Sequence, residues 1–150
     1  MYSVVLAIHN IVRWIALVLA IVAAVRAFLG WFRKQEWTAS DRKWGMYTAI
    51  AMDTQLLLGL LLYIFFSPIT KAALQDFGAA MAVQDLRYFA VEHAFVMLLA
   101  LVFAHLGSML PRRAKEAVAK RRMAAIFFTL TVLFILFGMP WMRPLFPGLG

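Results

Sequence analysis

Apolar residues fall into four long continuous runs along the chain, separated by short polar stretches. The runs cover about residues 3–32, 46–66, 86–110 and 123–141. Each is close to or longer than the roughly 20 residues that an α-helix needs to cross a bilayer. Apolar and polar positions do not alternate within the runs, which favours helices over the strands of a β-barrel. The pattern predicts an all-α fold, a bundle of four transmembrane helices running antiparallel, up-down-up-down, in a single membrane domain over residues 1–150.

Composition also favours insertion into a membrane. Hydrophobic residues make up 65% of the 150-residue chain, which is more than a soluble domain of this size can bury. The chain has no cysteine, and this excludes disulfides, iron–sulfur clusters and thiolate chemistry. The first run has no basic residue ahead of it and is too long for a signal peptide, so we expect it to be an uncleaved first span.

The net charge of +8 comes from basic residues placed between the apolar runs. This placement predicts a membrane topology and argues against nucleic-acid binding. Lysine and arginine are concentrated in the polar stretches 33–45 and 111–122, whereas the opposite side of the membrane would hold only Lys71, Arg87 and Arg143. By the positive-inside rule we expect both basic loops in the cytoplasm and both termini outside, in a bacterial inner membrane.

The stretch 67–85 is the only substantial loop on the predicted outer side. Ser67 and Pro68 end the second run. Residues 69–81 are predicted to form a short helix lying across the outer mouth of the bundle.

Ionisable residues inside the runs are costly at membrane depth, so each needs a compensating partner. At about 1.5 Å per residue, His9 on the first run and His93 on the third lie at about the same outer depth. Arg13 shares a helical face with His9, one turn deeper. Glu92, beside His93, is a natural counter-charge for Arg13. These residues define a predicted outer polar layer.

Arg26, Asp53 and His105 define a predicted inner polar layer on the first, second and third runs. Arg26 and Asp53 are expected to form an ion pair, which is how such residues are tolerated at depth. His93 and His105 are separated by about 18 Å along one helix, so they cannot ligate the same metal centre.

The sharpest interpretation of the outer layer is a b-type haem with His9 and His93 as its axial ligands. Helix bundles commonly hold cofactors between facing side chains, and haem iron accepts axial imidazoles. Arg87, about two turns outward of His93, is placed to meet a propionate. The chain has no CxxCH motif for covalent haem attachment.

Two other interpretations stay open at this point. The histidines and ion pairs would serve only as helix–helix contacts, which contribute on average about 0.6 kcal/mol each. Alternatively, the polar layers would form a proton or quinone pathway, because intramembrane acids and histidines mark such routes. A zinc site has too few depth-matched ligands. No P-loop, nucleophile elbow or HExxH motif is present, so we do not expect an enzyme.

Several short stretches resemble a known family. They are HNIVRW (9–14), QLLLGLLLY (55–63) and RYFAVEH (87–93), followed by AHLG (104–107). Together they resemble small bacterial four-helix membrane proteins labelled cytochrome-b-like, and the layout also resembles one four-helix half of haem A synthase. The resemblance implies a membrane protein that binds haem b through histidines on its helices. On the matching positions these are His9 and His93, with His105 as a further candidate.

One position departs from that family. Two residues before Gln55, where the family often has histidine, this chain has Asp53. A histidine there would lie at the depth of His105 and complete a second, inner haem pair. Asp53 is not an ordinary axial ligand, so the resemblance does not support a second haem. Arg26, Asp53 and His105 are interpreted instead as an inner polar cluster.

We therefore expect electron transfer through the membrane, or delivery of electrons to a membrane-bound redox partner, by one haem b near the outer face. The expected cofactor-binding residues are His9, His93, Arg13, Arg87 and Glu92, with the two histidines on the iron. The alternative is a non-catalytic accessory subunit of a larger respiratory or transport complex. In that case the intramembrane polar residues would serve assembly or contact with protons or a quinone.

Overall fold

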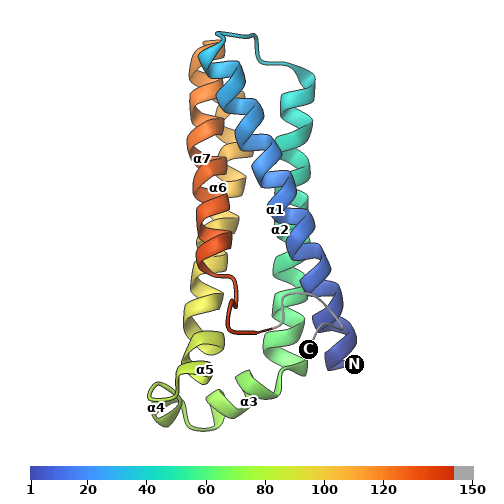
Figure 1. The fold of residues 1–150 in the computed structure, drawn as a ribbon, viewed down its shortest axis with the longest axis vertical. Helices are drawn as coiled ribbons and strands as arrows, with labels where there is room; N and C mark the ends of the chain where they lie inside the picture. Colours follow the sequence, from blue (N-terminus) through green and yellow to red (C-terminus); the bar gives the residue numbers. More distant parts are fainter. Residues whose placement is uncertain (144–150) are drawn as a thin grey trace.

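The computed structural model describes residues 1–143, and these residues form helices with no strand among them. Four long helical stretches run side by side (Figure 1). They are α1 (Tyr2–Phe32); α2 (Ala39–Leu61) with the π-helical turn η1 (Leu62–Phe66); α5 (Gln84–Arg87), the π-helical turn η2 (Tyr88–Glu92) and α6 (His93–Arg113); and α7 (Ala117–Phe137). Two short helices, α3 (Pro68–Gln75) and α4 (Phe77–Ala80), connect η1 to α5 at one end of the bundle.

The long helices form a bundle with α1 and α6 on opposite corners. Helix α1 packs against α2 and α7, and α6 packs against the same two helices. Helix α7 stops well short of the end at which α3 and α4 lie, and the chain after it turns across the bundle (Figure 1). At that end, the bundle therefore consists of only three of the four long helical stretches. In keeping with the predicted topology, we call the end that carries α3 and α4 the outer end and the opposite end the inner end.

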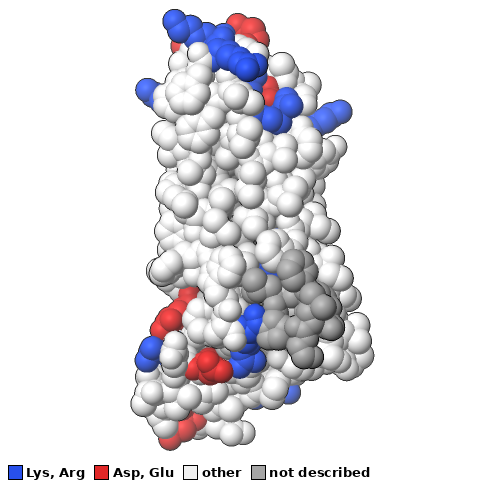
Figure 2. All heavy atoms as spheres, viewed as in Figure 1, with Lys and Arg blue, Asp and Glu red and all other residues white. Residues whose placement is uncertain are grey.

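Three of the helical stretches are long and apolar enough to cross a membrane: Tyr2–Phe32, Ala39–Phe66 and Gln84–Arg113. Helix α7 differs because Lys120, Arg121 and Arg122 occupy its first turns. The prediction of four spans is therefore supported for three. Figure 2 shows charged side chains gathered at the two ends of the molecule, with a broad, almost uncharged belt between them.

Helix α2 begins seven residues earlier than the apolar run 46–66 indicates, because a capping box forms its start. The Thr38 hydroxyl accepts a hydrogen bond from the backbone N–H of Asp41, and the Asp41 carboxylate accepts one from the backbone N–H of Thr38 at 2.9 Å. Such a box satisfies N–H groups that the first turn of a helix leaves unpaired. The predicted basic loop 33–45 is consequently much shorter than expected.

The other basic loop, predicted at 111–122, is also largely helical. Helix α6 continues through Pro111 to Arg113, and α7 starts at Ala117. The third and fourth helices are thus longer at the inner end than their apolar runs. At the outer end α7 stops at Phe137, four residues before the predicted limit of 141.

The predicted outer helix over residues 69–81 is present but interrupted. Pro68 occupies the first turn of α3, where its missing N–H costs nothing. The Ser67 hydroxyl caps α3, and the Asp76 carboxylate caps α4 by accepting from the backbone N–H of Ala79 at 2.9 Å. Asp76 therefore separates two short helices where one was expected.

The inner half of the bundle is closely packed because its contacts are made by small residues. Buried alanines on α1 meet buried alanines on α7 around the ring of Phe128. A Cβ atom on Gly107 of α6 would lie 2.9 Å from that ring, so the absence of a side chain there lets Phe128 sit between the helices. Small residues permit this close approach of helices in a membrane.

Candidate functional site

A cavity of about 640 Å³ lies in the outer half of the bundle, between α1, α2 and α6. Its wall is mostly apolar, and its polar lining includes His9, Asn10, Arg13, Gln55 and His93. The volume falls in the range of about 300–1,000 Å³ that is typical of ligand and cofactor pockets. The cavity exists because α7 ends early, so that Pro140 and Arg143, in the segment after it, border the space where a fourth helix would lie.

His9 and His93 face each other across this cavity. Their ring centroids are 6.5 Å apart and the ring planes are inclined by 66°. His9 comes from the outer third of α1, and His93 is the first residue of α6, directly after η2. The structure thus brings together the two imidazoles for which the sequence predicts a common depth.

The end of α7 holds the His93 ring. Nδ1 of His93 lies 2.7 Å from the carbonyl oxygen of Gly138, which can only accept a hydrogen bond. Nδ1 therefore carries the proton, and in the neutral ring Nε2 keeps its lone pair. The Tyr88 hydroxyl donates to the same carbonyl at 2.8 Å. Proteins orient metal-ligating histidines through such a hydrogen bond on the other ring nitrogen.

Gly138 is needed for this contact. A Cβ atom at this position would lie 2.2 Å from Cε of Met97 and 2.8 Å from Cγ1 of Val96. A side chain at residue 138 would therefore require Met97 and Val96, or the end of α7, to shift. The missing side chain therefore allows the Gly138 carbonyl to reach His93.

His9 is held less completely. Gln55 donates from Nε2 to the backbone carbonyl of His9 at 3.0 Å, and the same nitrogen lies 3.4 Å from Nε2 of His9. Nδ1 of His9 and Oε1 of Gln55 are both buried without a hydrogen-bond partner. An unsatisfied buried polar atom costs about 1–3 kcal/mol. His9 is therefore fixed less firmly than His93.

Two π-helical turns form the outer edge of the cavity. Tyr63 in η1 donates its hydroxyl to the carbonyl of Ala90 in η2 at 2.8 Å, and Thr70 donates to the carbonyl of Tyr63 at 2.9 Å. These bonds tie α2, α3 and the start of α6 together. π-Helical turns are rare and frequently occur at functional sites.

The remaining residues of the predicted outer layer are arranged differently from the expectation. Glu92 pairs with Arg87, Nε to Oε1 at 2.7 Å, and both side chains are nearly half exposed. The predicted Glu92–Arg13 ion pair is therefore wrong. Neighbouring residues on a helix point about 100° apart, so with His93 facing the cavity the Glu92 side chain turns away from it.

The arginines at the cavity also differ from the expectation. Arg13 is buried, lines the cavity and has its guanidinium 5.7 Å from the centroid of the Trp14 ring. Arg87 does not belong to the described lining. Arg143 does, and it pairs with Asp85 at 2.8 Å. Arg143 thus takes the place at the cavity wall that the sequence predicted for Arg87.

In the predicted inner layer, Arg26 pairs with Asp41 at 3.0 Å, and Asp53 instead pairs with His105 at 2.8 Å. The predicted Arg26–Asp53 ion pair is therefore wrong. The reason is the early start of α2, which places Asp41 within the bundle and opposite Arg26.

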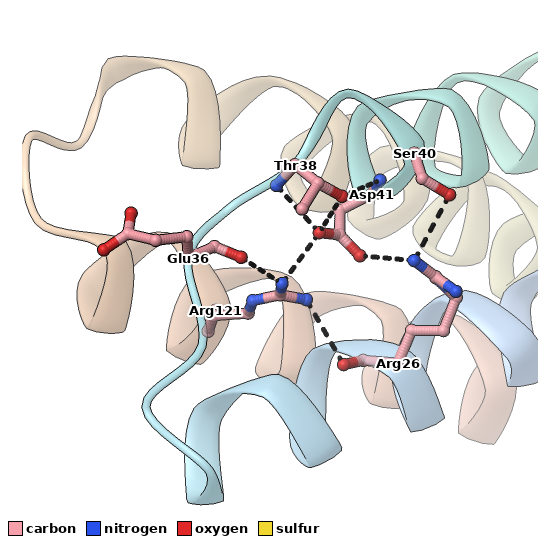
Figure 3. Close-up of polar contacts among 6 residues, drawn as sticks. All are labelled: Arg26, Glu36, Thr38, Ser40, Asp41 and Arg121. Atoms are coloured by element: carbon pink, nitrogen blue, oxygen red, sulfur yellow. Dashed lines mark hydrogen bonds and ion pairs between the residues drawn. The ribbon is translucent and has the colours of Figure 1, made fainter.

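Asp41 joins three helices in what we call the arginine clamp, consisting of Arg26, Asp41 and Arg121 (Figure 3). Oδ1 of Asp41 accepts from Arg26, and Oδ2 pairs with Nη2 of Arg121 at 2.8 Å. Arg121 also donates to the backbone carbonyls of Arg26 and Glu36. Asp41 and Arg121 are only 5% and 4% exposed. The sequence analysis missed this cluster, although the Thr38-x-x-Asp41 spacing is a capping-box signal.

The described residues, 1–143, contain no group of three or more His, Cys, Asp or Glu side chains that could hold a metal ion. A haem needs only axial ligands from the protein. A facing pair of histidines therefore fits a haem and does not fit an ordinary structural zinc site, which takes four protein ligands.

Comparisons with family models, with curated proteins and with solved structures gave no match for this chain.

Proposed function

We propose that the chain is a b-type haem-binding protein of a bacterial inner membrane that takes part in electron transfer, with one haem in the outer cavity. The observation that carries this proposal is the His9–His93 pair, whose rings lie 6.5 Å apart on the wall of a cavity of about 640 Å³. The orientation of the His93 ring by the Gly138 carbonyl supports it further.

His9 and His93 would hold the iron, His93 through Nε2 because its Nδ1 donates to Gly138. Arg13 and Arg143 line the same cavity and would supply charge-assisted hydrogen bonds to the propionates. When bound, the haem supplies one-electron redox chemistry.

The protein's own contribution is the environment of that centre. The mostly apolar cavity wall lowers the local dielectric, which strengthens the electrostatic interactions beside it. Arg13 lies one helical turn from His9, and its positive charge favours the state of the centre that carries one more electron. The arginine and the burial together would set the redox potential.

We also propose that α7 is the fourth span, with both termini outside and the basic end of the bundle in the cytoplasm. The predicted loops 33–45 and 111–122 both lie at the inner end, where Figure 2 shows blue side chains gathered. Lys120 and Arg122 in the first turns of α7 can extend their charged ends toward water while the apolar part of the helix stays in the membrane, and Arg121 is paired with Asp41. A membrane-bound redox partner would exchange electrons with the haem.

Absorption spectroscopy tests the proposal. Protein purified from haem-replete cells is expected to show a Soret band that shifts on reduction, together with resolved α and β bands. His9→Ala and His93→Ala should each remove the signature of two axial imidazoles. His105→Ala, on the same helix as His93 but outside the cavity, is the matched control and should retain it. A colourless protein that also fails to bind added haem would contradict the proposal.

A further inference from the structure

A second polar site lies outside the cavity, between α2 and α6. Oδ1 of Asp53 and Nε2 of His105 are 2.8 Å apart, and the two side chains are 50% and 39% exposed. Both residues lie within helical stretches that are long and apolar enough to cross a membrane. Neither belongs to the described lining of the outer cavity.

The exposure of this pair is unusual for its position. Ionisable residues in membrane spans almost always face the bundle interior or a water-filled cavity, and they mark pathways for substrates, ions or protons. The Asp53–His105 pair instead lies at the surface that would meet lipid. A pair that served only to join α2 to α6 would be better placed between the helices, where the arginine clamp is.

The contact within the pair uses only half of its polar atoms. The Asp53 carboxylate engages His105 through Oδ1, and the ring engages Asp53 through Nε2. Within the described part of the chain, the second carboxylate oxygen and Nδ1 of His105 have no recorded hydrogen bond. They can therefore contact a molecule that approaches from the membrane.

The surroundings of the pair are apolar. Ile50 and Leu57 lie one turn to either side of Asp53 on α2, and they are 53% and 63% exposed. Val102 and Met109 lie one turn to either side of His105 on α6, and they are 48% and 47% exposed. A ligand of this site therefore needs a small polar head group joined to an apolar body.

We propose that Asp53 and His105 bind the head group of a lipid-soluble quinone or quinol that enters laterally from the membrane. An imidazolium at His105 donates from Nδ1 to a quinone carbonyl, and a neutral imidazole accepts there from a quinol hydroxyl. The second oxygen of Asp53 accepts from the other quinol hydroxyl. An isoprenoid tail would lie along the apolar side chains that flank the pair.

Other occupants fit these observations less well. A phospholipid head group stays at the membrane interface, whereas Asp53 lies near the middle of Ala39–Phe66. A basic helix of a partner protein would need several acidic side chains, whereas the residues one turn to either side of Asp53 and of His105 are apolar. The site is separate from the proposed haem, since His105 and His93 are about 18 Å apart along α6. Quinone binding can therefore be measured whether or not the chain binds haem.

The test uses the full chain in phosphatidylcholine nanodiscs and a ubiquinone with two isoprenoid units, labelled with ¹³C at its carbonyls. Wild type is expected to bind it saturably, at one per chain, with the carbonyl stretching band lowered by hydrogen bonding. Asp53→Asn and His105→Phe should each weaken binding of the quinone or its quinol at least about 10-fold, because each removes a charge-assisted hydrogen bond. Thr54→Val is the matched control, because Thr54 is exposed on the same helix and donates only to the Ile50 carbonyl.

A second variant keeps the test decisive if the polar substitutions disturb folding. Val102→Trp adds bulk on the lipid-facing side of the pair without touching its polar atoms, and it should also weaken binding at least about 10-fold. Quinone uptake that rises linearly without saturation, or that is equal in wild type and Val102→Trp, overturns the proposal. So does a dimer of wild type that Asp53→Asn converts to monomer while no quinone binds, because the pair would then join two copies of the chain.

Discussion

The inner and outer halves of the bundle use similar polar residues for opposite purposes. At the inner end, both carboxylate oxygens of Asp41 are bonded to arginine, and the void beside the clamp is about 10 Å³, which is room for about one water at most. At the outer end, His9, Gln55 and His93 instead line a cavity of about 640 Å³. The inner half is thus filled by its own ion pairs, whereas the outer half places polar side chains around an open space.

The comparison suggests why the outer half can remain hollow. The clamp and the alanine contacts around Phe128 join α1, α2 and α7 at the inner end. The outer half then needs only local ties, such as the bonds from Tyr63 and Tyr88 to backbone carbonyls. Substitutions at the two ends should therefore differ in what they change, stability at the inner end and ligand binding at the outer end.

The largest effect is expected from Asp41→Ala. It would leave Arg121, which is 4% exposed, without its carboxylate partner. Removing one partner of a buried ion pair costs about 3–5 kcal/mol. Unfolding of the purified protein in a denaturing detergent, followed by circular dichroism, measures this loss.

Glu36→Gln is the matched control for Asp41→Ala. Arg121 contacts Glu36 through the backbone carbonyl, and the Glu36 side chain is exposed. Its replacement should change stability by less than about 0.5 kcal/mol. Equal stability of Asp41→Ala and wild type would show that the clamp does not stabilise the inner end.

A smaller effect, of about 1–3 kcal/mol, is expected from Gly138→Ala, because overpacking a tight contact costs that much. The added Cβ would lie 2.2 Å from Cε of Met97, which can turn aside, and 2.8 Å from Cγ1 of the stiffer Val96, so we expect the end of α7 to move away from α6. That movement would also take the Gly138 carbonyl away from Nδ1 of His93. We expect a lower thermal midpoint together with an altered haem spectrum, measured on the same preparation.

Gly78→Ala is the control for this substitution. A Cβ at residue 78 would lie 3.6 Å from Oδ1 of Asp76, which is an ordinary contact. An altered spectrum in Gly78→Ala, or an unchanged one in Gly138→Ala, would show that the end of α7 does not control the orientation of the His93 ring.

Depth along the helices is the part of the site that the sequence predicts well. The rise of an α-helix is fixed at about 1.5 Å per residue, so the position of His9 and His93 relative to the ends of their runs is enough to match them. The same argument correctly separates His105 from the outer layer. The same fixed rise sets the length of an apolar run that can cross a membrane, so hydropathy also predicts the helices and the long apolar spans.

The choice of partner was not predictable, because it depends on rotation about the helix axis and on where each helix starts. Because of the capping box at Thr38, α2 includes Asp41, and Arg26 pairs with Asp41 and not with Asp53. The π-helical turn η2 alters the rotation of residues 88–92 about the helix axis, and the Glu92 side chain pairs with Arg87. Hydropathy contains neither signal.

The cavity could not be predicted either, because it depends on the residue at which α7 ends. The apolar run continues to Trp141, but the helix stops at Phe137. The difference of four residues, about 6 Å of helix, opens the space below α7 and brings the Gly138 carbonyl to His93. A hydropathy pattern does not distinguish apolar residues within a helix from those just after it.

Tyr88→Phe should have a moderate effect, of about 0.5–1.5 kcal/mol, which is the usual contribution of one hydrogen bond. Its hydroxyl donates to the Gly138 carbonyl that also accepts from His93. Tyr47→Phe is the control, because Tyr47 is exposed and its hydroxyl has no recorded hydrogen bond within the described residues. Thermal unfolding compares the two variants, and equal midpoints would show that the bond from Tyr88 does not hold the end of α7.

The smallest change in stability is expected from Gln55→Leu, at less than about 1 kcal/mol. The substitution loses the bond to the His9 carbonyl, but it also removes Oε1, a buried atom with no partner. These effects have opposite signs and similar size. Ligand binding should respond more strongly, because Gln55 lies 3.4 Å from Nε2 of His9. Haem titration and thermal unfolding of one preparation separate the two. A loss of stability above about 2 kcal/mol would mean that Gln55 stabilises the outer half as Asp41 stabilises the inner half, and the contrast between the two ends would fail.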